Sequence, residues 1–160
     1  MNFFLAKCQE PPIADALFGL CDNQEGSKAY SNITDPSKWI AVVKNSSNKT
    51  CIFTAIDKCV INDDEEIGRG RCDGMLTTED QIFFVELKDI RKSWITDAIE
   101  QLESTVQFFL ANHDISVYRH KKAVACNKKG RFQVIDNELN LRFFRTYGIR
   151  LDVQADIIIV

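Results

Sequence analysis

The chain has 160 residues, of which 45% are hydrophobic and 27% charged, and its formal net charge is −3. This length allows one domain with a substantial core, and the composition is that of a globular protein rather than a disordered or fibrous one. No apolar run is long enough to span a bilayer and no basic leader precedes one, so we expect neither a membrane partner nor a signal peptide.

The first half of the chain gives weak signals up to about residue 38 and clearer ones afterwards. Two adjacent prolines before an apolar stretch are typical of a helix start, and a segment rich in Ser, Asn, Asp and Gly is typical of a surface loop. Runs of β-branched and aromatic residues predict strands. The expected elements are a helix from Pro11, a loop over 23–38, strands over 38–44 and 50–61, and an acidic connector over 62–66.

The second half predicts a β-hairpin, a long helix and further strands. The helix is the clearest element, because its apolar residues recur at helical spacing and Ser93 is a suitable N-cap. The expected elements are strands over 71–77 and 81–88, a helix from Ser93 to about Ala111, and strands over 117–126, 131–135 and 155–160. The fold class expected is α/β or α+β, a single domain over 1–160 with a central mixed β-sheet flanked by helices.

Charge is distributed unevenly along the chain. Residues 57 to 89 include ten acidic and four basic residues, whereas residues 113 to 150 include nine basic and three acidic residues. An acidic centre beside a basic flank suits a metal site next to a phosphate-binding surface. A solvated exterior of mixed charge gives such blocks equally well.

Three charged residues on the predicted hairpin form the main candidate site. Side chains alternate along a strand, so Glu86 and Lys88 share one face of the second arm, and Asp73 on the first arm can lie beside Glu86. Two carboxylates and an ammonium would then converge. A turn-forming Asp and a solvated Glu-x-Lys ladder are the plain alternative, but the apolar neighbours Phe84, Val85 and Leu87 favour a buried strand on which charges are costly.

This order of motifs resembles the PD-(D/E)XK nuclease superfamily. Asp73 matches the first acid of that family, Glu86 and Lys88 match its Glu-x-Lys, and Cys72 stands where the family name has proline. The resemblance covers roughly residues 66–126 and implies a restriction endonuclease-like core.

A weaker likeness points to the recombination exonuclease branch of this superfamily. Gly70 and Asp73 resemble its Gly-x-x-Asp variant, and Gln101 falls where that branch has a glutamine motif. The tyrosine that usually follows is absent, because the corresponding positions read Glu103-Ser104-Thr105.

The resemblance implies a metal-dependent nuclease that hydrolyses phosphodiester bonds of DNA, with RNA left open as a substrate. Hard carboxylate oxygens suit Mg²⁺ or Mn²⁺, so the expected ligands are Asp73, Glu86 and the backbone carbonyl of Leu87, with Glu66 as a possible third acid. Lys88 is expected to orient or activate the attacking water, and Gln101 to assist. Candidate nucleic-acid contacts are Arg69, Arg71, Arg91, Lys92, Lys121 and Lys122.

Two other functions remain open at this point. One is a catalytically inactive module on the same fold that binds nucleic acid or protein, since fold alone never determines function. The other is an interaction protein that uses the acidic face from Asp63 to Glu66. A homodimer, paired through the apolar C-terminal strand, is compatible with each of these functions.

The six cysteines do not show metal-ligand spacing. No CxxC pair occurs, and the two histidines, His113 and His120, lie in no zinc motif. Cys51 and Cys126 lie among apolar neighbours. We therefore expect reduced cysteines that act as small apolar residues in a cytoplasmic protein.

Overall fold

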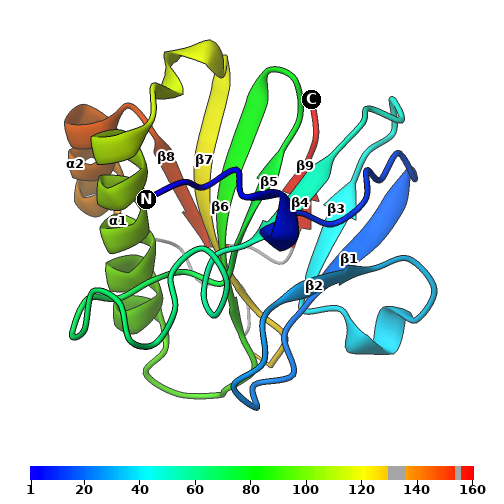
Figure 1. The fold of residues 1–160 in the computed structure, drawn as a ribbon, viewed down its shortest axis with the longest axis horizontal. Helices are drawn as coiled ribbons and strands as arrows, with labels where there is room; N and C mark the ends of the chain where they lie inside the picture. The colour runs from blue at the N-terminus through cyan, green and yellow to red at the C-terminus, as the bar shows by residue number, and fades with distance from the viewer. Residues whose placement is uncertain (130–135, 154–155) are drawn as a thin grey trace.

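The protein folds into three layers in a computed structural model, which describes residues 1–129, 136–153 and 156–160. A five-stranded sheet lies in the middle, with helices against one face and a four-stranded sheet against the other (Figure 1). The fold is thus a mixed α/β fold with two mixed sheets and two α-helices in the described ranges.

The five-stranded sheet carries the candidate site. Its strands lie in the order β4-β5-β6-β7-β8, antiparallel from β4 to β6 and parallel from β6 to β8. A tight turn joins β5 to β6, in which Thr78 N–H donates to the carbonyl of Gln81 at 2.9 Å. The strand bounds are β4 Ile52–Ala55, β5 Gly74–Thr77, β6 Gln81–Lys88, β7 His120–Asn127 and β8 Arg150–Val153.

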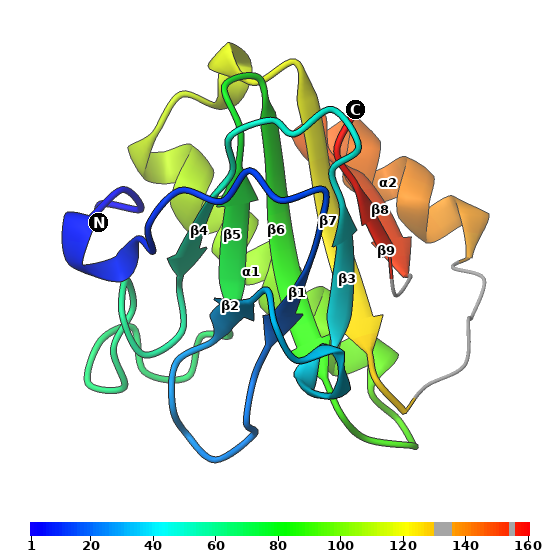
Figure 2. The ribbon, with the colours of Figure 1, turned by 90° about the vertical axis from the view of Figure 1, so that its right-hand side faces the viewer.

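The four-stranded sheet is built from both ends of the chain (Figure 2). Its order is β2-β1-β3-β9, and β9 from the C-terminal part runs parallel to β3 from the N-terminal part. Such parallel pairing joins segments more than a hundred residues apart. The bounds are β1 Leu17–Cys21, β2 Tyr30–Asn32, β3 Ala41–Lys44 and β9 Asp156–Ile158.

Alternation along β6 divides the apolar core into two parts. Ile82 and Phe84 belong to the cluster beneath the helices, whereas Phe83 and Val85 belong to the cluster shared with the four-stranded sheet. Because β6 is buried on both faces, every residue from Gln81 to Leu87 is almost inaccessible to water. A charged residue on this strand therefore lies inside the protein.

The two helices cover only one face of the central sheet. These are α1, Ile95–Asn112, and α2, Asn137–Tyr147, whose Leu102 and Phe143 pack into the same cluster. The expectation of a sheet flanked by helices is thus met on one side only, because the apolar faces of β1 and β3 cover the other. Three short 3₁₀ helices complete the fold, η1 Ala6–Cys8, η2 Pro36–Lys38 and η3 Ile115–Val117.

Several N-terminal predictions are wrong. No helix begins at Pro11; instead the chain runs extended beside β4, where Ile13 and Cys51 exchange backbone hydrogen bonds. The strand expected over 50–61 ends at Ala55, because the backbone then turns, with Lys58 at a positive φ of 70°. The loop expected over 23–38 contains β2 and η2.

The elements predicted for the C-terminal half agree better with the structure, with three corrections. The helix begins at Ile95 with Trp94 as its N-cap, since Ser93 adopts a φ of 52° and makes no capping bond. Helix α2 and strand β8 were not predicted. The strand expected over 131–135 lies outside the described residues.

The expectation that all six cysteines are reduced is wrong for two of them. Cys8 and Cys59 form a disulfide that ties the N-terminal segment to the turn after β4, whereas the other four cysteines are free and buried. The spacing of 51 residues gave no local sign of this pairing. In the described part of the chain, neither helix is both long enough and apolar enough to cross a bilayer.

Candidate functional site

Asp73 and Glu86 lie opposite each other where β5 begins and β6 nears its end. The ladder pairs Gly74 with Val85, so one further step places Asp73 across from Glu86. The backbone N–H of Leu87 donates to Asp73 Oδ2 at 2.7 Å, which fixes the carboxylate against β6. The geometry expected from strand alternation is therefore present.

Both carboxyl groups are buried in a way that disfavours their charge. Asp73 is 9% exposed and Glu86 only 1%. Burial raises the pKa of Glu86 well above its usual value, and repulsion from Asp73 adds to this. Burial likewise raises the pKa of Asp73 to about 6, against a side-chain hydrogen bond with Glu86 and the backbone hydrogen bond from Leu87. A positive charge close to the two carboxyls would counter these shifts, because it favours their charged form.

Lys88 is the positive group of this site. Its Nζ lies 3.8 Å from Glu86 Oε2, which is an ion-pair distance but too long for a hydrogen bond. Glu86 Oε2 consequently has no hydrogen-bond partner although it is buried. Because buried polar atoms in folded proteins are nearly always hydrogen-bonded, this oxygen is an exception and has the capacity to accept a bond from a ligand.

Helix α1 holds the first arm of the site in place through Thr105. The buried Thr105 hydroxyl accepts a 2.7 Å hydrogen bond from Cys72 N–H and donates to the carbonyl of Gln101 at 2.9 Å. Cys72 is thereby fixed one residue before Asp73. Sequence reasoning missed this role, because a threonine on a helix gives no sign that its hydroxyl bonds to a distant strand.

Gln101 lies on α1 under the loop that leads to Asp73. A Cβ at Gly70 would lie 3.3 Å from both Cα and Cγ of Gln101, so the loop passes tightly over the helix. Gln101 Oε1 is buried and has no hydrogen-bond partner. The predicted glutamine is thus close to the loop but has an unused acceptor.

A third carboxylate reaches the site from the four-stranded sheet. Asp22 follows β1, and its negative charge contributes to the raised pKa of Asp73. In the same loop Gln24 N–H donates to Asp22 Oδ1 at 3.1 Å, and Gln24 Nε2 donates to the carbonyl of Leu87 at 3.2 Å. The carbonyl expected as a metal ligand is therefore occupied by Gln24. No local sequence signal identifies Asp22, because only the packing of two sheets brings it here.

A hollow of about 370 Å³ adjoins the site on the side of the acidic connector. Asp57, which lines it, adds to the repulsion that raises the pKa of Glu86.

The arginines that line this hollow are already engaged. Arg71 binds Asp57 through Nε at 2.6 Å and Asp63 through Nη2. Arg71 is thus held by two carboxylates, neither of which is Asp73, two residues further along the chain. Arg69 donates to Gln107 at 3.1 Å and stacks on the Phe108 ring.

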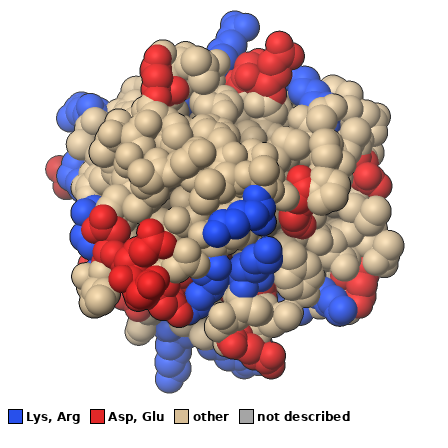
Figure 3. Space-filling view, viewed as in Figure 1, with Lys and Arg blue, Asp and Glu red and all other residues tan. Residues whose placement is uncertain are grey.

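The remaining candidates lie farther from the carboxylates. Glu66 is exposed on the acidic connector, whose side chains gather at the lower left of the molecule (Figure 3), and it is not among the groups that shift the pKa of Asp73 or Glu86. Arg91 and Lys92 are exposed in the loop that follows β6, within four residues of Lys88. Lys121 and Lys122 pair with the first residues of β6, at the other end of the strand.

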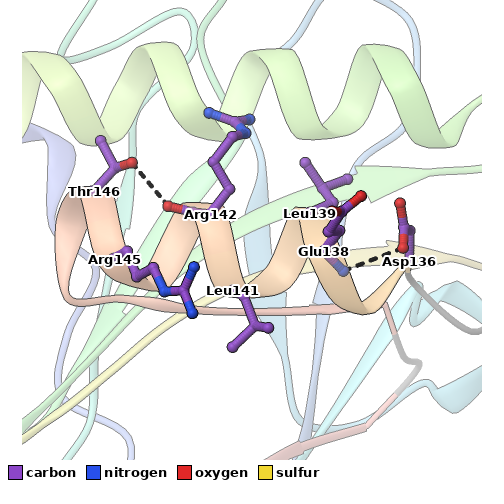
Figure 4. Close-up of a pocket in the computed structure, with 7 residues that line it drawn as sticks. All are labelled: Asp136, Glu138, Leu139, Leu141, Arg142, Arg145 and Thr146. Atoms are coloured by element: carbon purple, nitrogen blue, oxygen red, sulfur yellow. Dashed lines mark hydrogen bonds between the residues drawn. The ribbon is translucent and has the colours of Figure 1, made fainter.

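Helix α2 borders a separate hollow of about 470 Å³ (Figure 4). Arg142 points toward α1, where it pairs with Glu103 at 3.2 Å, whereas Leu141 and Arg145 point away from that helix. Asp136 accepts from Glu138 N–H at 3.1 Å and caps the helix. The polar groups that line this hollow are thus largely engaged in holding the helix, and we assign no function to the hollow.

The chemistry open to the site follows from its composition. Within the described ranges no group of three or more His, Cys, Asp or Glu side chains is arranged to hold a metal ion by itself. Two buried carboxylates, one with a free oxygen, suit a hard cation that keeps several waters, as Mg²⁺ commonly does. Lys88 adds a positive group beside the free oxygen.

In comparisons with known proteins, no family model, curated protein or solved structure matches the chain.

Proposed function

We propose that this protein is a metal-dependent nuclease that hydrolyses phosphodiester bonds of DNA on a restriction endonuclease-like core. The observation that supports this most directly is the buried Glu86, whose Oε2 has no hydrogen-bond partner and lies beside Asp73 and Lys88. The hairpin, the helix α1 and the parallel strand β7 follow in the order on which the resemblance rests. A cytoplasmic location is proposed on the four free, buried cysteines alone, since a disulfide such as Cys8–Cys59 is rare in cytoplasmic proteins.

The donor set fits Mg²⁺ or Mn²⁺. Asp73 and Glu86 would hold the ion, and the Leu87 carbonyl would join them once Gln24 releases it. The bound ion would neutralise phosphate charge and supply a nucleophilic water near neutral pH. Asp73 is held in place for this task by Leu87 N–H, and Cys72 by Thr105.

Lys88 would act on the water and the phosphate. Its Nζ lies next to Glu86 and its side chain is 18% exposed, so it can face both the buried carboxylate and a substrate at the surface. There it would orient the attacking water and offset the negative charge that grows on the phosphate. Arg91 and Lys92, in the loop after β6, are proposed to contact the flanking backbone.

The test is a cleavage assay with supercoiled plasmid and single-stranded DNA in Mg²⁺ or Mn²⁺. Wild type is compared with Asp73→Ala and Lys88→Ala, and with Glu79→Gln as a matched control in the turn at the far end of β6. Metal-dependent cutting that both site variants abolish and the control retains supports the proposal. Equal cutting by wild type and Lys88→Ala would contradict it.

One observation favours the alternative, a binding module without activity. The Leu87 carbonyl is occupied by Gln24 and Glu86 is 1% exposed, so the site is closed as it stands. A wild-type protein that binds nucleic acid, leaves it uncut with either metal, and shows no Mn²⁺ binding by calorimetry would support this alternative.

A further inference from the structure

We propose that the hollow at the start of β7, at the end of the central sheet opposite the carboxylates, is a binding site for single-stranded nucleic acid. The inference does not depend on the proposed nuclease activity. It rests on a concave surface, on its charge and on one exposed aromatic ring.

The hollow lies at the end of the central sheet where β6, β7 and β8 begin, next to β9 of the four-stranded sheet. Its volume is about 580 Å³, and it is lined by residues from the starts of β6, β7 and β8 and from β9. Gln81, one of its lining residues, pairs with His120, whereas Lys88 at the other end of β6 pairs with Asn127. Gln81 and Lys88 are seven steps apart along the strand, which corresponds to about 23 Å. The hollow and the carboxylate site are therefore distinct.

The charge of the hollow is entirely basic among its side chains. Four cations and one histidine line it, with no aspartate or glutamate among the lining residues: Arg119, His120, Lys121, Lys122 and Arg150. The oxygen of Val160 at its rim already accepts from Gln81 Nε2 at 2.8 Å and from Lys49. A concave surface that is lined with positive charges attracts anionic ligands.

Three of these cations are not neutralised by the protein. Lys122 pairs with Asp152 at 3.1 Å, but in residues 1–129, 136–153 and 156–160 no carboxylate lies within ion-pair distance of Arg119, Lys121 or Arg150. The two segments outside these ranges contain neither Asp nor Glu. Cations without partners in a hollow leave their charge available to a ligand.

Phe144 gives the site a flat apolar surface beside the charge. This ring is 46% exposed at the rim, and the Arg150 guanidinium lies 5.7 Å from its centre. An aromatic ring next to arginine is the combination that stacks a base while cations bind the adjacent phosphates. An acidic protein segment would use the cations but not the ring, so the ring favours a nucleic acid with unpaired bases.

The test measures binding of the full chain to a fluorescein-labelled 12-nucleotide thymidine strand by anisotropy. EDTA is present throughout, so that any metal-dependent contact or cleavage at the carboxylates is absent. The matched control for the charge change is Lys7→Ala/Lys38→Ala, which removes two exposed cations far from the hollow in sequence. Circular dichroism verifies that each variant is folded.

We expect Arg119→Ala/Arg150→Ala to weaken binding at least tenfold and the control to stay within twofold. The slope of log K against log salt should fall by about 1.4, because each lost phosphate contact on a single strand removes about 0.7. Phe144→Leu, which keeps an apolar side chain but no ring, should weaken binding by about five- to hundredfold, since this is the range that a base–aromatic stack contributes.

Three outcomes would overturn the proposal. Equal weakening by the double variant and by the control would show general electrostatic attraction rather than a site. Polyglutamate of equal charge that competes as well as unlabelled DNA would assign the surface to an acidic protein partner. Thymidine monophosphate that competes as well, per molecule, as the 12-nucleotide strand would assign it to a free nucleotide.

Discussion

The two ends of strand β6 have opposite characters. At its C-terminal end Glu86 is sealed from water and has an oxygen without a partner, whereas at its N-terminal end the hollow is open, with Arg119 and Arg150 exposed and Lys121 and Lys122 partly exposed. Buried charge of one sign requires a specific counter-charge, while exposed charge attracts any suitable partner. We infer that the buried end is suited to chemistry and the open end to binding, and four experiments test this division.

The largest effect is expected from Lys88→Ala at the buried end. Removing a group that orients the water and offsets developing charge should lower the metal-dependent cleavage rate by about 10²- to 10³-fold. Binding of the single strand at the open end should not change. Single-turnover cleavage and anisotropy, measured on the same preparation, check both; weaker binding together with slower cleavage would break the division.

Thr105→Val should destabilise the protein at the buried end. The variant keeps the shape of the side chain but leaves Cys72 N–H without its acceptor, which costs about 1–3 kcal/mol in the free energy of unfolding. Urea denaturation measures this. Ser104→Ala is the matched control, because the Ser104 hydroxyl is buried and has no partner, so its loss should be neutral or slightly stabilising. Equal losses in both variants would contradict the role given to Thr105.

Glu86→Gln should stabilise the metal-free protein by about 1 kcal/mol, since it removes a buried carboxyl whose charged form is disfavoured by burial and by repulsion from Asp73. Thermal unfolding in EDTA should show a higher Tm than wild type. The rise in Tm that Mn²⁺ gives to wild type should then be absent. A lower Tm in EDTA would mean that Glu86 is a structural residue rather than one retained at a cost to stability.

Gln24→Ala should have the smallest effect. Loss of its hydrogen bond would free the Leu87 carbonyl, and a net bond energy of about 0.5–1.5 kcal/mol corresponds to about two- to twelvefold tighter Mn²⁺ binding. Calorimetry measures the dissociation constant. Weaker binding by this variant would show that Gln24 supports the metal position instead of occupying it.

The middle of the chain could be predicted because its patterns are local. Alternation along 81–88 and helical spacing over 95–112 each arise within one element, and the register between Asp73 and Glu86 follows from a short hairpin. These features placed the three charged residues together. Their roles in catalysis stay a prediction.

The parts that sequence reasoning missed depend on distant packing or on signals that were present but not used. Asp22 reaches Asp73 only because a second sheet covers the first, and Thr105 matters only through its bond to Cys72. Helix α2, by contrast, has a capping Asp136 and a Gly148 with a φ of 71° just after its end, both ordinary boundary signals. The sequence predicts Lys121 and Lys122 as nucleic-acid contacts, but it does not show at which end of the sheet they lie, because that depends on the pairing of β7 with β6.

The disulfide between Cys8 and Cys59 has a practical consequence for handling the protein. It joins two positions on either side of the exposed loop between β1 and β2. A protease that cuts this loop would leave two fragments joined covalently, so the nicked protein would run at its full mass on a non-reducing gel. Only electrophoresis after reduction with a thiol would reveal the cut.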